Sequence, residues 1–422
     1  MHKENQLKYI NLLKKELIPA LGCTEPIAIA FAAAKAREVL GAIPDRTVMR
    51  CSGNIIKNAK SVTVPNSGGR HGIEFAALLG ITGGKADLML ETLSSVTEKD
   101  IDMAGELLKN GACTVELIEN APPLQIEAVL YKGNDSVLVE IKDSHTNIVR
   151  IEKNGTAVFK KEAGADICQD DDYGFLTLSE IYEFVEEVDI SEIKDVLFRQ
   201  AQLNTAISEE GISGSYGMGV GSTILKYSGD TVEAKAKAMS AAGSDARMGG
   251  CPLPVVINCG SGNQGITACM PVLVYAEHLN VSEDKKYRAL ALSNLISLYQ
   301  KKYLGRLSAY CGAVCAACGS GAAIAYLATG DFDVVSRTIT NTLGNVSGIV
   351  CDGAKASCAA KIASCVDSAI MGLHMAMENR AFNSGDGIIK GSVDKTIQSA
   401  GRLGRMGMKD TDTEILRIML DS

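Results

Sequence analysis

The feature that most constrains the fold is a change of pattern partway along the chain. Segments between residues 46 and 160, such as SVTVP, IEAVLYKG and SVLVEIKD, have the alternation and β-branched content of strands. From about residue 176 onward, helical stretches alternate with Gly-rich turns, and almost no strand pattern remains. The sequence therefore predicts an α+β domain over residues 46–165 and a large all-helical domain over residues 176–422, joined by the acidic segment ICQDDDYG (167–174).

The first 45 residues are expected to form two helices that pack on the helical domain. In residues 3–17, Leu7, Ile10 and Leu13 share one helical face. Charges occur throughout this pattern, so it lacks the uninterrupted apolar core of a signal peptide. No run approaches the ~20 apolar residues of a transmembrane helix. We therefore expect a cytoplasmic protein that does not enter a membrane.

The charge of the chain limits which classes of partner it can be expected to bind. Its formal net charge is −8, and it contains no basic tract. Nucleic acid and anionic membranes are therefore excluded as expected partners. A small-molecule substrate remains, and the sequence leaves a homo-oligomer open.

The chain contains thirteen cysteines, an odd number without an export signal. Disulfides are rare in reducing cytosol, so these residues are expected to be buried thiols, reactive thiols or metal ligands. A buried thiol is the commonest state of a free cysteine. Functional cysteines must therefore be identified from their local sequence.

Two segments surround several thiols with Gly and Ala. The first contains Cys311, Cys315 and Cys318, and the second contains Cys351 and Cys358. Small residues let backbone amides approach the sulfides of an iron–sulfur cluster. This pattern favours such a cluster over a tight helix crossing in which the thiols only pack. The residues alone do not decide which of the three cysteines in the first segment is the ligand.

Spacing limits the choice in the second segment. Cys351, Cys358 and Cys365 are seven residues apart, which is about 10.5 Å per step along a continuous helix. A turn at Asp352-Gly353, followed by a helix, would bring Cys351 back toward Cys358. Cys365 lies two helical turns further on, so we expect it to pack in the core.

Cys23 stands directly before a predicted helix. Thr24 can cap this helix and Pro26 suits its first turn. A helix N-terminus favours negative charge, so this position predicts a thiol with a lowered pKa.

The segments LGCTEP, SGNIIKNAK, PNSGG, GSGNQG, YCG, GIVCDGAK and SGDG occur in this order. Together they resemble the L-cysteine desulfidase family, which is related to the alpha chain of iron–sulfur L-serine dehydratases. The resemblance spans nearly the whole chain and implies the dehydratase alpha-chain fold. It also implies that Cys311, Cys351 and Cys358 hold an iron–sulfur cluster, and that Cys23 lies at the active site. The chain departs from the dehydratases in having CDG for CDP and a shorter spacing between its last two ligands.

The resemblance implies a β-eliminating lyase that converts L-cysteine to pyruvate, ammonia and hydrogen sulfide. A [4Fe-4S] cluster with one open iron would act as a Lewis acid. Cys23 would act as the base at the substrate Cα. The alternative role for Cys23 is that of a fourth cluster ligand, and the alternative reaction is the dehydration of L-serine.

Further candidates for substrate binding come from polar turns. Glu25 is expected either to hold the substrate ammonium or to complement the helix start. Asn66 and Ser67 offer hydrogen-bond donors to a carboxylate unless they form a surface turn, and His71 is a candidate acid or base. Asn263 precedes an apolar helix whose N-terminus can hold an anion. Since these groups come from both predicted domains, we expect the substrate to lie between them.

Two other classes of function compete with this hypothesis. Pyridoxal-phosphate lyases catalyse the same elimination, but the chain has no recognisable Schiff-base lysine motif. A non-catalytic protein that carries an iron–sulfur cluster or senses redox state is the second alternative. GMGVG (217–221) lacks the strand–helix context of a nucleotide site.

Overall fold

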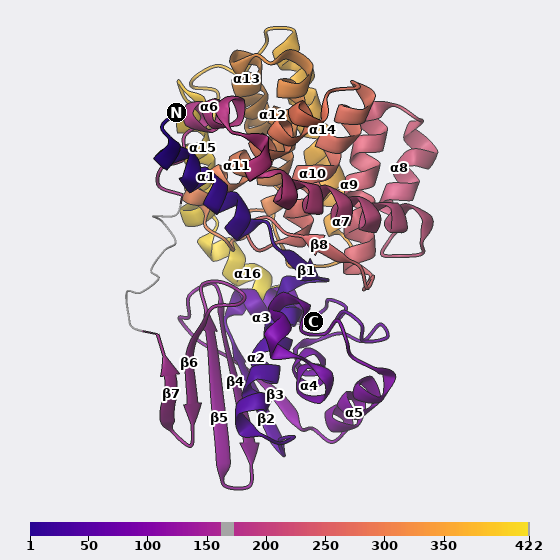
Figure 1. The fold of residues 1–422 in the computed structure, drawn as a ribbon, viewed down its shortest axis with the longest axis vertical. Coiled ribbons are helices and arrows are strands. Elements are labelled where there is room, and N and C mark those ends of the chain that lie inside the picture. The colour runs from indigo at the N-terminus through magenta and orange to yellow at the C-terminus, as the bar shows by residue number, and fades with distance from the viewer. Residues whose placement is uncertain (162–172, 421–422) are drawn as a thin grey trace.

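The computed structural model describes residues 1–161 and 173–420 and consists of two parts stacked along its longest axis (Figure 1). The lower part in that view contains the sheet, and the upper part is built from helices. This mixed fold has the two patterns that the sequence predicts. Residues 167–172 of the expected linker lie outside the described residues.

A six-stranded mixed sheet is the scaffold of the α+β domain. Its strand order is β3–β2–β4–β5–β6–β7, and only β2 and β3 run parallel. The strands are β2 (Arg46–Cys51), β3 (Cys113–Leu117), β4 (Gln125–Lys132), β5 (Asp135–Lys142), β6 (Ile148–Lys153) and β7 (Thr156–Lys160). Helices interleaved with them are α3 (Gly53–Ala59), α4 (Ile73–Gly83), the 3-10 helix η1 (Ala86–Glu91) and α5 (Glu98–Lys109).

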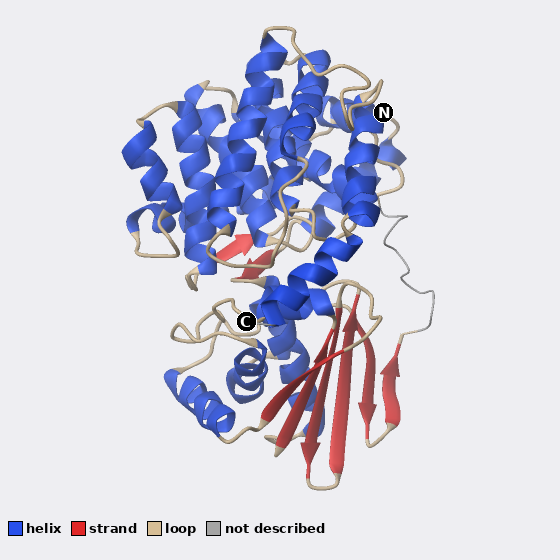
Figure 2. Ribbon diagram, turned by 180° about the vertical axis from the view of Figure 1, so that it is seen from behind, coloured by secondary structure: helices blue, strands red, loops and turns tan. Residues whose placement is uncertain are grey.

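Helix α2 (Thr24–Leu40) belongs to this domain, which corrects the expectation that both N-terminal helices pack on the helical domain. It packs against α4 and across β4 and β5, and Figure 2 shows these helices grouped on one face of the sheet. Residues 27–34 of α2 are all buried. A helix that is apolar on all sides must be covered on all sides, and the sheet supplies that cover.

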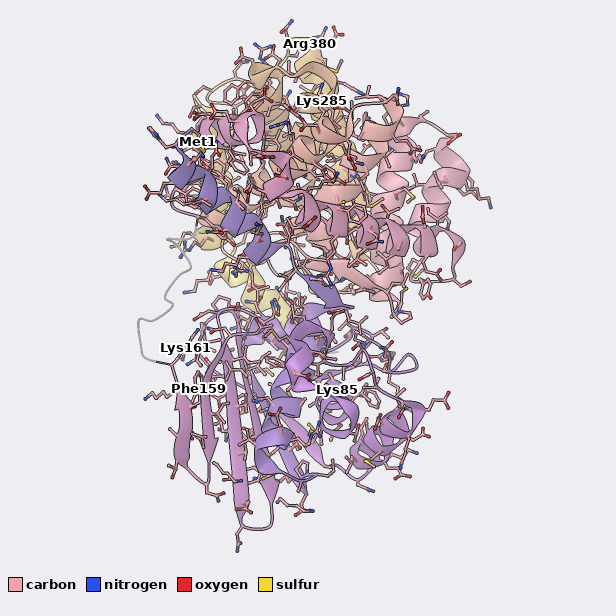
Figure 3. The ribbon with its side chains drawn as sticks, in the orientation of Figure 1. Met1, Lys85, Phe159, Lys161, Lys285 and Arg380 are labelled. Atoms are coloured by element: carbon pink, nitrogen blue, oxygen red, sulfur yellow. The ribbon has the colours of Figure 1, made fainter. Side chains whose placement is uncertain are left out.

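Helix α1 (Lys3–Glu16) packs on the helical domain, as the sequence predicts. Its Tyr9 stacks on Phe184 with ring centroids 4.8 Å apart. The N-terminal amine of Met1, labelled in Figure 3, forms an ion pair with Glu183 at 2.8 Å. The chain therefore starts on the helical domain and crosses to the sheet only at α2.

The helical domain is organised around α12 (Gly312–Thr329), which contacts four other helices. This helix is long and apolar enough to cross a membrane, whereas no segment of that kind is expected from the sequence. However, 83% of it is buried inside the protein, as is typical of a core helix. The other helices are α6 (Leu178–Glu187), η2 (Ile190–Glu192), α7 (Lys194–Ser213), α8 (Val220–Ser228), α9 (Val232–Met248), α10 (Gly262–His278), α11 (Glu283–Leu304), α13 (Phe332–Val346), α14 (Cys358–Met377), α15 (Val393–Arg402), the π-helix η3 (Leu403–Gly407) and α16 (Lys409–Leu420).

The helical domain is not entirely free of strand pairing. β8 (Pro254–Val256) pairs antiparallel with β1 (Pro19–Leu21), which lies just before α2. A second short pairing joins Tyr310 to Val350. A three-residue pairing and a single bridge are too short to leave an alternating pattern in the sequence, and both lie beside cysteines of interest.

The C-terminal helix α16 lies between the two domains in Figure 1 and packs against α3. The buried Lys57 of α3 forms an ion pair with Asp412 of α16. Lys60 Nζ also donates to the backbone oxygen of Met419 at 2.7 Å. The last helix therefore ties the α+β domain to the helical domain.

Candidate active site

A cavity of about 100 Å³ lies between the two domains. Its α+β wall consists of Cys23, Thr24 and Glu25 at the start of α2 and of Asn54 and Asn58 on α3. The helical wall comes from the starts of α10, α12 and α14, the end of α9 and the loop after α11. Six of the predicted site residues line this cavity: Cys23, Glu25, Asn263, Cys311, Cys351 and Cys358.

A second cavity of about 430 Å³ adjoins the first. The two share lining residues on α3 and in the segment 301–308. The larger cavity extends to α16, with Asp412 in its wall. A small molecule thus has adjoining space beside the smaller cavity, next to the helix that ties the domains together.

A short antiparallel pairing brings Cys311 and Cys351 together. Tyr310 bridges Val350, and the backbone N–H of Cys351 donates to the oxygen of Ala309 at 2.6 Å. Alternate residues of paired strands point to the same side. Cys311 and Cys351 flank the bridged pair, so they lie on the same side of it, at the cavity.

Cys358 reaches the same cavity from the first residue of α14. Its thiol points toward the backbone oxygen of Gly353 at 3.6 Å. Gly353 has a left-handed backbone, with φ of +96°, and a Cβ there would lie 2.4 Å from the oxygen of Lys57. Glycine therefore lets the segment after Cys351 pass close to α3, and the thiols of Cys351 and Cys358 line one wall.

Four helix N-termini meet at the cavity. Cys23, Ser261 and Cys311 are the N-cap residues of α2, α10 and α12, and Cys358 begins α14. The N-terminus of a helix carries a partial positive charge and unpaired amides. The cavity therefore favours anions, and three of these four positions are occupied by thiols.

The remaining cysteines of the two segments do not reach the cavity. Cys315, Cys318 and Cys365 are fully buried inside α12 and α14 and pack in the helical core. None of them lines the cavity, whereas Cys311 does. The geometry therefore favours Cys311 as the ligand of the first segment, and Cys365 packs in the core as the sequence predicts.

The three thiols of Cys311, Cys351 and Cys358 at one cavity are the type of donor that an iron–sulfur cluster takes. Among the described residues, no three His, Cys, Asp or Glu side chains are placed to hold one ion. A four-iron cluster does not need such a group, because its thiolates bind different irons. Burial raises the pKa of the Cys311 thiol, and the neighbouring Cys351 and Cys365 thiols raise it further. Ionising these sulfurs together therefore needs a cation among them.

Cys23 and Glu25 form a hydrogen-bonded pair at the opposite wall. The Cys23 thiol donates to Glu25 Oε2 at 3.1 Å, and Thr24 Oγ1 donates to the same oxygen at 3.1 Å. Asn58 Nδ2 donates to Glu25 Oε1 at 2.9 Å, and His145 Nε2 lies 3.8 Å from that oxygen. Glu25 is the only carboxylate among the described residues that line the cavity.

The structure corrects the expected pKa of Cys23. Burial raises the pKa of this thiol well above its usual value, the Glu25 carboxylate raises it further, and the charge of Arg247 opposes the rise. For Glu25, burial favours the neutral form, but the nearby His145 and the hydrogen bonds from Cys23 and Asn58 hold its pKa below the usual range. Desolvation thus outweighs the helix N-terminus, and the shared proton resides on sulfur.

Asn66, Ser67 and His71 do not line the cavity, which corrects their assignment to substrate binding. Asn66 has a left-handed backbone, with φ of +54°, and its Nδ2 donates to the oxygen of Leu93. Ser67 Oγ donates to the oxygen of Arg70, and His71 is exposed. These polar groups hold a turn together, which is the alternative that the sequence had left open.

We expect His71→Ala and Asn66→Gly to leave the KM for the amino-acid substrate within about twofold of wild type, because substitutions away from buried contacts have small effects. Glycine suits the left-handed backbone at position 66. Asn58→Ala is the contrast, because it removes a donor to Glu25 at the cavity wall. Steady-state kinetics of the three variants check this. A large KM increase in His71→Ala would place the turn in the site.

Asn263 lines the cavity, as the sequence predicts, and its Oδ1 has no hydrogen-bond partner. The same holds for Asn54 Oδ1, Asn58 Oδ1 and Gln264 Oε1 among the described residues. Buried polar atoms are normally paired. Several unpaired amide oxygens around one cavity indicate that a polar ligand completes the site.

Sequence reasoning missed several lining residues. Arg247, Lys301 and Arg306 bring three cations to the cavity, and Cys259 adds a buried thiol on a left-handed backbone, with φ of +48°. Cys259 directly precedes the GSGNQG segment, which was a usable signal. Arg247 lies in an ordinary helical stretch, SDARMGG, and no local pattern marks it.

The GMGVG segment has a structural role. The backbone N–H groups of Met218 and Gly221 donate to the two carboxylate oxygens of Asp245 at 3.2 and 3.1 Å. Asp245 is fully buried in α9. These amides thus bind the carboxylate of the chain itself, and the segment is not a nucleotide site.

Comparisons with known proteins agree with the architecture. Residues 87–417 match the family model described as serine dehydratase alpha chain. The chain is 52% identical to a UPF0597 protein of Lachnoclostridium phytofermentans over 98% of this chain and 99% of the relative. It is 49% identical to one of Desulfitobacterium hafniense (98% and 96% covered) and 45% identical to one of Treponema denticola (100% and 99% covered).

Proposed function

We propose that this chain, which belongs to the UPF0597 family and contains a serine dehydratase alpha chain domain, is a lyase that removes the β-substituent of a small amino acid. We propose L-cysteine as the substrate, with pyruvate, ammonia and hydrogen sulfide as products. The observation that carries the proposal is the cavity between the domains, where Cys311, Cys351, Cys358 and Cys23 meet four helix N-termini.

Cys311, Cys351 and Cys358 would hold a [4Fe-4S] cluster in this proposal. When bound, the cluster supplies an open iron that acts as a Lewis acid toward the leaving group. The helix N-termini complement the negative charge of the three thiolates. All three cysteines are partly buried and line the cavity.

Glu25 is the group that would bind the substrate ammonium, since no other carboxylate of the described chain lines the cavity. Its hydrogen bond with Cys23 then places the substrate Cα beside the Cys23 sulfur. Cys23 would act as the base in its thiolate form and accept the Cα proton, while Glu25 stays ionised and holds the substrate ammonium. The Cα–H electron pair forms the Cα=Cβ bond, the Cβ–S bond breaks, and sulfur leaves with its electron pair. The aminoacrylate product hydrolyses to pyruvate and ammonia.

Dehydration of L-serine is the second candidate, and the match to the serine dehydratase alpha chain model favours it. The chemistry differs only in the leaving group, hydroxide instead of hydrosulfide. The reducing conditions that an iron–sulfur cluster with open iron requires agree with the proposed cytoplasmic location.

An anaerobic preparation supplied with either amino acid tests the proposal. We expect both amino acids to yield pyruvate and ammonia, with a higher kcat/KM for L-cysteine. With L-cysteine, one sulfide should be released per pyruvate. A higher kcat/KM for L-serine would make dehydration the function. A preparation that holds iron and labile sulfide but forms no pyruvate would indicate the non-catalytic alternative.

A further inference from the structure

Arg247 is a buried cation that no carboxylate of the described chain neutralises. It lies in the last turn of α9, its side chain is 2% exposed, and it lines the cavity. Its Nε donates to the backbone oxygen of Gly22 at 2.9 Å, and the described residues provide no ion pair for it. A buried charge without a counter-ion is costly. An anion in the cavity would offset that cost.

The acidic residues nearest in sequence or in the cavity are already engaged. Asp245, two residues before Arg247, accepts hydrogen bonds from the backbone N–H groups of Met218 and Gly221. Glu25 accepts from Cys23, Thr24 and Asn58. Neither carboxylate is therefore the partner of Arg247.

The neighbouring glycine shows that space has been left for the guanidinium. A Cβ on Gly262, the first residue of α10, would lie 2.3 Å from Arg247 Nε and 2.9 Å from Cζ. The guanidinium thus lies against the N-terminus of α10, which itself favours an anion. With Nε bound to Gly22, the two terminal nitrogens remain, and this planar fork matches the two oxygens of a carboxylate.

Arg247 also lies beside the proposed reaction centre. Its charge lowers the pKa of both Cys23 and Cys358, so it is close to both thiols. Lys301 is the other buried cation of the wall that has no carboxylate partner among the described residues. Its charge lowers the pKa of Cys259 and Cys315 instead. Arg247 is therefore the cavity cation whose charge acts on both the proposed base and one proposed ligand, Cys358.

We propose that Arg247 is the residue that binds the α-carboxylate of the amino-acid substrate. This inference rests on the proposed function and names the group that orients its substrate. With the carboxylate at Arg247 and the ammonium at Glu25, two of the three polar substituents around Cα are fixed. The Cα–H bond is then held toward Cys23 and the β-substituent toward Cys311, Cys351 and Cys358.

Equilibrium binding to the holoenzyme tests this proposal without turnover. L-alanine carries the ammonium and the carboxylate but has no leaving group, and L-alaninamide lacks the carboxylate charge. We expect Arg247→Gln to raise the Kd of L-alanine about 10- to 100-fold, as loss of a hydrogen bond to a charged group does. The Kd of L-alaninamide should change less than about threefold. Calorimetry gives both constants, and iron content confirms that the variant is loaded.

Two further variants keep the test decisive. Gly262→Ala should displace the guanidinium and weaken L-alanine but not L-alaninamide, even if Arg247→Gln does not fold. Lys301→Gln is the matched control and should leave the ratio of the two Kd values unchanged.

The assignment would be overturned if Arg247→Gln weakened the binding of L-alanine and L-alaninamide equally. It would also be overturned if Lys301→Gln, and not Arg247→Gln, weakened L-alanine selectively. Loss of iron from Arg247→Gln with an unchanged L-alanine Kd would also overturn it, by giving Arg247 a role in holding the cluster. If the wild-type enzyme forms pyruvate but Arg247→Gln does not weaken L-alanine more than L-alaninamide, this inference alone is refuted. If Arg247→Gln weakens L-alanine selectively but the wild-type protein forms no pyruvate, the proposed lyase activity is refuted and the carboxylate site is retained.

Discussion

Cys23→Ser is expected to abolish most sulfide and pyruvate production while the protein keeps its iron. Serine retains the shape of the side chain and is itself a favoured N-cap residue, so α2 should start as before. A serine hydroxyl is a much weaker acid than a thiol, so its proton-accepting anion does not form at neutral pH. Removal of a general base typically costs on the order of 10²–10⁴ in rate. Anaerobic kinetics together with iron content and cluster absorption measure both effects.

The outcome also separates the two roles of Cys23. Loss of iron from the variant would show that Cys23 is a fourth ligand. Full iron with near-normal turnover would show that another group takes the proton. Glu25→Gln is the companion variant, because it keeps the size of the side chain but removes the carboxylate that accepts from Cys23 and would hold the substrate ammonium. Both variants should therefore lower kcat if the pair acts as proposed.

Cys311→Ser is expected to remove the iron–sulfur cluster and with it all turnover. A serine oxygen is a poor replacement for a thiolate ligand, and three protein thiolates are the minimum in the proposed site. Cys311 caps α12 without a side-chain hydrogen bond, so a serine cap should maintain the helix. Iron and labile sulfide per chain should fall to near zero, while the unfolding temperature of the apoprotein stays close to that of wild-type apoprotein.

Cys315→Ser is the matched control, four residues later on the same helix. Its side chain is buried in the core and does not line the cavity. A hydroxyl there is expected to cost stability, about 1–3 kcal/mol if it finds no partner, but not iron. If Cys315→Ser lost the iron and Cys311→Ser kept it, the ligand assignment in this segment would be wrong.

Several functional positions could be recognised without the structure because their signals are local. Cys311 and Cys358 stand among Gly and Ala, Cys23 stands directly before a helix, and Asn263 follows a glycine turn. Each signal depends on neighbours within about one helical turn, and the structure places all four residues in one cavity. Asn66, Ser67 and His71 had the same kind of signal, but turn-forming residues and anion-binding residues share a composition.

The pKa of Cys23 could not be inferred from its local position. The helix N-terminus is visible in the sequence, and it favours the thiolate. Burial of the thiol and the carboxylate beside it are not visible there, and both raise the pKa. Burial depends on what packs over a residue, so the sign of the shift required the tertiary structure.

The sequence by itself determined the two classes of secondary structure and the helix starts that carry the thiols, because strand alternation, helical periodicity and capping act over a few neighbouring residues. Only the tertiary structure decided that α2 belongs to the sheet, that Cys311 rather than Cys315 reaches the cavity, and that Arg247 lies beside Cys23 and Cys358. Each of these depends on contacts between segments far apart in the chain, such as the pairing of Tyr310 with Val350 and the hydrogen bond from Arg247 to Gly22. Such contacts are selected by how whole helices and the sheet bury their apolar faces together, and no local pattern records that choice.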